Sequence, residues 1–129
     1  MSETWYHGGY PGLAPGDILL PPDESGATHT LSQYAQRLGA PHGTRRDCVY
    51  LTNVQQVARA HAAMYPDGAL YECEPDGSVE PDPDAPGLSV MVERARIVAV
   101  VRPRVVFAHR TPESWIRLMV TAAEKAVRS

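Results

Sequence analysis

Apolar residues recur at helical spacing in three segments of the chain. The segments are residues 31–38, residues 54–64 and a C-terminal stretch that begins at Thr111. Asn53 is placed to cap the second helix, while Thr111-Pro112-Glu113 puts a capping hydroxyl, a first-turn proline and an acidic residue in the order that a helix start favours. The inward face of the last helix is expected to carry Trp115, Leu118, Met119 and Ala122.

Runs rich in β-branched, aromatic and aliphatic residues predict short strands around these helices. The expected strands are residues 5–7, 18–20, 49–52, 69–74, 96–101 and 105–107. Pro75-Asp76-Gly77 predicts a turn that ends the fourth strand, because proline presets one dihedral angle and glycine accepts a positive φ. By composition alone, the acidic stretch 80–87 is typical of a solvated loop.

The order of these elements does not follow the strand and helix alternation of a doubly wound fold. It predicts an α+β fold with mostly antiparallel strands, in a single domain that spans residues 1–129. No Gly-x-Gly-x-x-Gly follows a strand and no P-loop sequence is present, so the chain lacks the usual Rossmann and P-loop signatures.

Composition and charge narrow the function classes. The chain has 129 residues, of which 43% are hydrophobic, and a formal net charge of -3. Since no apolar run approaches the ~20 residues that cross a bilayer and the N-terminal residues do not resemble a secretion signal, we expect a cytoplasmic protein without membrane contact. The negative charge offers no general attraction for nucleic acid, although Arg45 and Arg46 form a local basic pair.

The cysteines and histidines do not suggest a metal centre. Cys48 and Cys73 lie in strand-like stretches and are expected to be buried thiols. The five histidines are scattered without a close pair or a cysteine partner, so we expect no metal.

Three local patterns carry candidate chemistry: His7-Gly8-Gly9, Tyr50-Leu51-Thr52 and the carboxylates of the acidic stretch. Each pattern also has an ordinary structural explanation. His7 could be a strand-end histidine bonded to the backbone, and Gly8 a turn glycine. Tyr50 could be a core aromatic, and Thr52 a strand former.

Together these segments resemble the rifamycin ADP-ribosyltransferases, whose active site is described by a His, a Tyr and an acidic residue. Tyr6-His7-Gly8 followed by Leu13-x-x-Gly16-Asp17 is similar to the opening of the family. Val49-Tyr50-Leu51-Thr52 is similar to its Tyr-bearing strand, and Tyr71 to Pro83 to its Glu-Pro-x-Gly segment with the catalytic acid. The resemblance covers roughly residues 5–101, while the stretch 18–47 is longer than in the family and the segment after Pro86 is shorter.

The resemblance implies two small, mostly antiparallel sheets that form a cleft, with peripheral helices. It implies His7, Tyr50 and Asp82 as catalytic residues, and His7, Gly8, Tyr50 and Thr52 as residues that bind NAD, the co-substrate. Breaking the nicotinamide glycosidic bond generates an oxocarbenium-like ribose. An imidazole to hold ribose hydroxyls, an aromatic face for nicotinamide and a nearby carboxylate suit that chemistry.

The implied activity is transfer of ADP-ribose to a hydroxyl of a small molecule such as a rifamycin-like antibiotic. Such a modification would make a bacterium resistant to the antibiotic. We expect the enzyme to be a monomer. Three alternatives stay open. The acceptor could be a protein or the end of a nucleic acid, or the chain could be a non-catalytic NAD-binding module. Glu80 or Asp84 could replace Asp82 as the acidic residue.

Overall fold

A computed structural model describes residues 3–21, 47–83 and 85–128 of the chain. The helix expected at residues 31–38, the basic pair Arg45 and Arg46, and Asp84 lie outside the described residues. The elements in order are β1 (Trp5–Gly9), β2 (Ile18–Leu19), β3 (Val49–Thr52), α3 (Gln55–Ala63), β4 (Ala69–Pro81), β5 (Ser89–Arg102), the short 3-10 helix η1 (Phe107–His109) and α4 (Pro112–Arg128).

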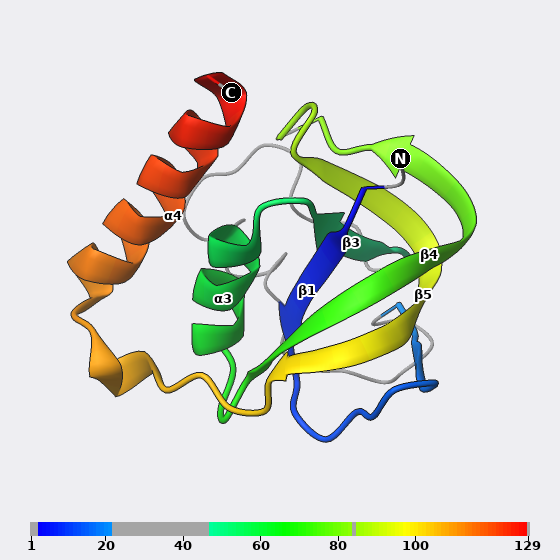
Figure 1. The fold of residues 1–129 in the computed structure, drawn as a ribbon, viewed down its shortest axis with the longest axis horizontal. Coiled ribbons are helices and arrows are strands. Elements are labelled where there is room, and N and C mark those ends of the chain that lie inside the picture. The colour runs from blue at the N-terminus through cyan, green and yellow to red at the C-terminus, as the bar shows by residue number, and fades with distance from the viewer. Residues whose placement is uncertain (1–2, 22–46, 84, 129) are drawn as a thin grey trace.

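The described strands form one antiparallel sheet that closes on itself (Figure 1). The strand order is β2-β5-β3-β1-β4, and β4 also pairs with β5. The expected α+β fold with antiparallel strands is therefore confirmed. The two separate sheets are not found among the described residues. β4 pairs with β1 and β5, and β5 also pairs with β2 and β3, so all five strands belong to one sheet.

The long β4–β5 hairpin corrects the expected turn at Pro75-Asp76-Gly77. Pro75 and Asp76 lie inside β4 and pair with β5, and the register shifts between Asp76 and Val79. Gly77 has φ 91°, so its preference for positive φ produces a bulge in a continuing strand instead of a chain reversal. The reversal occurs between Pro81 and Ser89.

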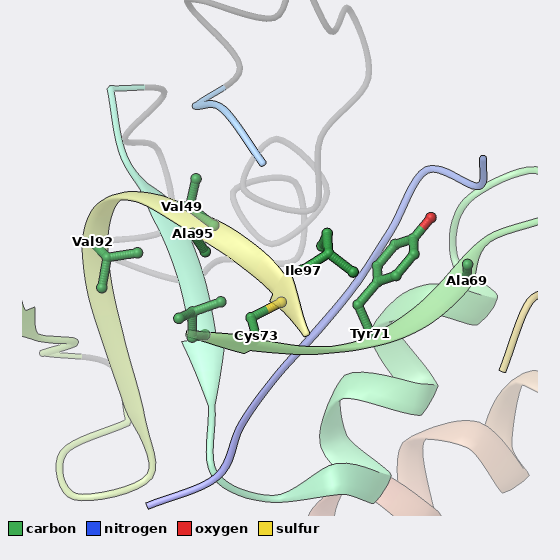
Figure 2. Packing of buried hydrophobic residues seen from close by; sticks show 8 residues of the cluster. Val49, Ala69, Tyr71, Cys73, Val92, Ala95 and Ile97 are labelled. Atoms are coloured by element: carbon green, nitrogen blue, oxygen red, sulfur yellow. The ribbon is translucent and has the colours of Figure 1, made fainter. Parts of the chain in front are cut away.

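Two clusters of buried side chains hold the fold together. The first lies on one face of the sheet and is seen close up in Figure 2; it contains Val49, Leu51, Ala69, Tyr71, Cys73, Val92, Ala95 and Ile97. The second joins the opposite face to α3 and α4, and contains Leu70, Val105, Trp115 and the buried alanines of α3. In Figure 1, α3 lies between the sheet and α4. Both cysteines are buried, as expected.

The observed helix starts agree only in part with those predicted from the sequence. The Thr111 hydroxyl accepts the N–H of Ser114, so the expected cap of α4 is confirmed. The Val54 N–H at the start of α3 donates to the Thr52 hydroxyl instead of Asn53. Residues 105–107 are not a strand, since Phe107 begins η1. Among the described helices, none combines the length and apolar character that a membrane span requires.

Candidate functional site

His7 joins the first two segments of the resemblance. The strands β1 and β3 pair at Tyr6 and Thr52. The side chain of His7, the next residue of β1, extends towards β3. Its Nδ1–H donates to the carbonyl oxygen of Tyr50 at 2.9 Å, which links residues 43 positions apart in the sequence. The structure therefore brings His7 to the backbone of Tyr50, as neighbours on two adjacent strands.

This hydrogen bond fixes the chemistry of the imidazole. A carbonyl oxygen only accepts, so Nδ1 carries the hydrogen and, in the neutral ring, Nε2 presents a lone pair. Burial lowers the pKa of His7, although the hydrogen bond to Tyr50 acts in the opposite direction. His61 on α3 has a pKa lowered to about 4, first by burial and then by the charge of His7. Both imidazoles are therefore neutral at pH 7.

The two glycines after His7 have different environments. A Cβ at Gly8 would overlap the carbonyl oxygen of Ala58 and approach the Ala62 nitrogen at 2.5 Å, so Gly8 is required for α3 to pack on β1. A Cβ at Gly9 would instead lie 2.6 Å from Nε2 of His7. The absent side chain at Gly9 therefore leaves room beside the acceptor nitrogen.

The motif Leu13-x-x-Gly16-Asp17 forms a turn that docks on β5. The Asp17 carboxylate accepts the N–H of Ala14 at 2.8 Å. Gly16 donates to the Ile97 carbonyl at 2.8 Å, and Ile97 donates back to the Asp17 carbonyl at 2.9 Å. Gly16 has φ 93°, a conformation that explains the glycine of this motif. The match to the family opening is thus a structural turn that follows the His7 strand.

Tyr71 holds the other end of this loop. Its hydroxyl donates to the Tyr10 carbonyl at 2.7 Å and accepts the Leu13 N–H at 3.2 Å. Burial raises the pKa of Tyr71, which keeps the hydroxyl protonated and able to donate. Tyr71 pairs with His7 across β1 and β4, so it contacts both the strand that carries the histidine and the loop that follows it. Sequence reasoning did not identify this residue, because only its partners 58 and 61 positions away show its role.

Tyr50 and Thr52 share one face of β3. Their neighbours Val49 and Leu51 belong to the first core cluster, so alternation along the strand puts Tyr50 and Thr52 on the opposite face. His7 pairs with Tyr71 of the first cluster, and its side chain therefore starts from the face that Tyr50 does not share. The structure places the imidazole against the backbone of Tyr50, with the phenol directed to the other side of β3.

The acidic residues differ in position and exposure. Asp82 lies just after β4, is only 8% exposed, and donates its backbone N–H to the Ser89 carbonyl at 3.1 Å. Ser89 pairs with Thr52, so Asp82 is separated from Thr52 by one strand, β5. Glu80 is exposed and is level with Tyr50, because both pair with Met91. Both carboxylates therefore lie next to the part of β5 that pairs with β3.

The described residues offer no evident metal centre, since no group of three or more His, Cys, Asp or Glu residues among them could hold an ion. In comparisons with known proteins, no protein-family model matches the chain, and a search of curated proteins finds no match.

Proposed function

We propose that this protein is an NAD-dependent mono-ADP-ribosyltransferase that releases nicotinamide and transfers ADP-ribose to a hydroxyl of a small molecule. The observation that carries the proposal is the His7 imidazole, which the Tyr50 carbonyl holds in one tautomer. Its Nε2 accepts hydrogen bonds at the position where Gly9 has no side chain. A neutral, fixed acceptor of this kind suits a ribose hydroxyl, and it stands on the segment that resembles the rifamycin ADP-ribosyltransferases.

The other residues take the remaining roles. NAD supplies the ribose whose glycosidic bond to nicotinamide breaks. Tyr50 holds the His7 ring through its backbone carbonyl, since its phenol lies on the other face of β3. Asp82 offers a carboxylate that stabilises developing positive charge or orients the acceptor hydroxyl. Gly8 supports the site through its contact with α3, which holds β1 in place.

The test is to incubate the purified chain with NAD, with and without rifamycin, and to measure nicotinamide release and the mass of the antibiotic. We expect His7→Ala to weaken NAD binding on the order of tenfold, the effect of one lost contact. Tyr50→Ala keeps the backbone carbonyl that holds His7 and should weaken NAD binding less. Asp82→Asn should lower kcat on the order of a hundredfold with little change in NAD affinity. His109→Ala, at an exposed histidine in η1, is the matched control.

The outcomes separate the competing functions. Nicotinamide release without a mass increase on rifamycin would reject the antibiotic and retain the transferase class. Transfer of label from NAD into protein or nucleic acid would identify a macromolecular acceptor. NAD binding without any nicotinamide release or exchange would favour a non-catalytic module. Effects of His7→Ala and Asp82→Asn that are no larger than that of the His109→Ala control would overturn the site assignment.

A further inference from the structure

The loop between β4 and β5 is bonded to a third strand. The Leu88 carbonyl accepts the Thr52 hydroxyl at 2.9 Å and the Asn53 backbone N–H at 2.9 Å. The Asn53 side-chain amide donates to the Gly87 carbonyl at 3.1 Å. Two consecutive carbonyls of the loop are therefore held by two consecutive residues at the end of β3.

A hairpin does not need these bonds to close. Within the loop, the Ala85 N–H donates to the Asp82 carbonyl and the Leu88 N–H to the Ala85 carbonyl, both at 3.1 Å. Asp82 also donates to Ser89 across the base. These contacts shape the turn, while the pairing of Ser89 with Thr52 and the Ser89 hydroxyl, which donates to the Leu51 carbonyl at 2.9 Å, join its base to β3. The bonds from Thr52 and Asn53 restrain the part of the loop before that base, at Gly87 and Leu88.

The same threonine also connects the loop to α3. Its hydroxyl donates its one hydrogen to Leu88 and accepts the N–H of Val54 at 3.1 Å. Thr52 is two residues from Tyr50 on the same face of β3, so the loop is bonded to the strand that carries the tyrosine. Asp82 is the acidic residue of this loop that the structure describes, and it is buried.

We infer that Thr52 and Asn53 form a latch that fixes Gly87 and Leu88 of the β4–β5 loop against β3, and that both are positioning residues for the Asp82 carboxylate. The inference rests on the proposed function for its catalytic half. The latch itself depends only on the hydrogen bonds. It assigns Thr52 a role through the loop, where the family resemblance implied contact with NAD.

The experiment compares Thr52→Val, which removes the hydroxyl, with Thr52→Ser, which keeps it, and with Asn53→Ala. Thr111→Val is the matched control, because the Thr111 hydroxyl also accepts a backbone N–H near a helix start but belongs to the start of α4. Hydrogen exchange of the peptide covering residues 82–89 and the kinetics of nicotinamide release are measured on each. Thr52→Val and Asn53→Ala should accelerate exchange and lower kcat on the order of tenfold, as a small displacement of a reacting group does, with KM for NAD little changed. Thr52→Ser should restore both.

Each result decides one half of the inference. Unchanged exchange in both Thr52→Val and Asn53→Ala would overturn the latch, whether or not the chain acts on NAD. Faster exchange with unchanged kcat would overturn the positioning role. If Thr52→Val does not fold, Asn53→Ala decides alone, since Asn53 does not cap α3. A wild-type chain that releases no nicotinamide would reject the proposed function and the catalytic half together, while exchange would still decide the latch.

Discussion

Gly8 and Gly9 are adjacent and identical in the sequence, yet a methyl group meets different atoms at the two positions. At Gly8 it meets the backbone of α3, which cannot move without separating the helix from β1. We expect Gly8→Ala to lower the free energy of unfolding by about 3 kcal/mol or more, as overpacking against backbone does. Chemical denaturation measures this. A loss below about 1 kcal/mol would show that α3 is not held at this distance from β1.

At Gly9 the atoms nearest to the methyl group belong to the His7 ring, which can rotate away. We expect Gly9→Ala to cost about 1 kcal/mol of stability through the weakened bond to Tyr50, and to reduce NAD affinity on the order of tenfold. Calorimetric titration with NAD measures the second effect. Unchanged affinity in a folded Gly9→Ala variant would argue that Nε2 of His7 does not face the ribose.

The buried histidines make stability depend on pH. His61 has a pKa of about 4 in the folded chain and an ordinary pKa of 6.5. Below about pH 6.5 this side chain is therefore protonated more in the unfolded chain than in the folded chain. Its contribution is fully present above pH 6.5 and is lost as the pH falls towards 4. From about pH 7.5 to about pH 5 the loss from this group is about 2 kcal/mol. His7 adds a loss in the same direction.

The measurement is the free energy of unfolding of the wild type and of His61→Gln at both pH values. His7 contributes as well, so the difference between the two proteins isolates His61. The wild type should lose more stability than the variant. Equal losses would mean that His61 is accessible to protons in the folded state.

At the scale of elements, α4 is attached by one side of its surface. Trp115 is buried in the second core cluster, and its indole N–H donates to the Phe107 carbonyl at 2.7 Å. The guanidinium carbons of Arg59 and Arg110 each lie 5.6 Å from the centroid of its ring. Ile116, the next residue, is 51% exposed.

We expect Trp115→Ala to lower the free energy of unfolding by about 3 to 5 kcal/mol, because it removes a large buried side chain and a buried hydrogen bond. Ile116→Ala is the control and should change it by less than about 0.5 kcal/mol, since the side chain is largely in solvent. Urea denaturation followed by circular dichroism measures both. Similar losses in the two variants would show that α4 packs through a different side.

The sequence predicted correctly those elements that short stretches of neighbouring residues determine. The cap Thr111, the first-turn Pro112 and the helical spacing gave α4, and the β-branched run gave β3 with its observed bounds. Pro75-Asp76-Gly77 was misinterpreted because pairing with β5 outweighs the turn preference of three residues. Residues 105–107 are as apolar as a strand. Val105 is nevertheless buried in the second core cluster without joining the sheet.

The candidate site was predictable as residue types but not as geometry. The motifs indicated His7, Tyr50 and Asp82, yet the His7–Tyr50 contact uses a backbone carbonyl, which no side-chain pattern encodes. Alternation on β3 follows from the sequence, whereas the face of His7 relative to Tyr50 follows from how β1 pairs with β4. The loop contacts of Thr52 and Asn53 likewise depend on a partner more than 30 residues away.

At the scale of the whole molecule, the strands form a closed ring. β1 pairs with β3 and β4, and β5 pairs with β3 and β4, so each of these four strands has two neighbours within the ring, and β5 pairs with β2 as well. Releasing any one of them exposes unpaired backbone on both flanking strands. The two core clusters also share the sheet between them. The described part of the chain should therefore unfold as one cooperative unit.

Cys73 tests this cooperativity, because it lies in the middle of the ring. It pairs with Trp5 on one side and Ile97 on the other. Burial, with a smaller effect from Glu72, raises its pKa to about 12, so the folded state holds almost no reactive thiolate at pH 8. We expect Cys73 to be alkylated only at the rate of global unfolding. Peptide mapping by mass spectrometry distinguishes it from Cys48, and tryptophan fluorescence reports the unfolding rate.

Trp5 packs against the first core cluster and Trp115 belongs to the second, so fluorescence follows both halves of the molecule. If the ring is cooperative, mild denaturant should accelerate alkylation and the fluorescence change by the same factor. Alkylation of Cys73 that runs ahead of the full fluorescence change would mean that β1, together with Trp5, leaves β4 while Trp115 and the helices stay packed. Because β1 carries His7, such local opening would also make the proposed NAD-binding strand the least stable part of the sheet.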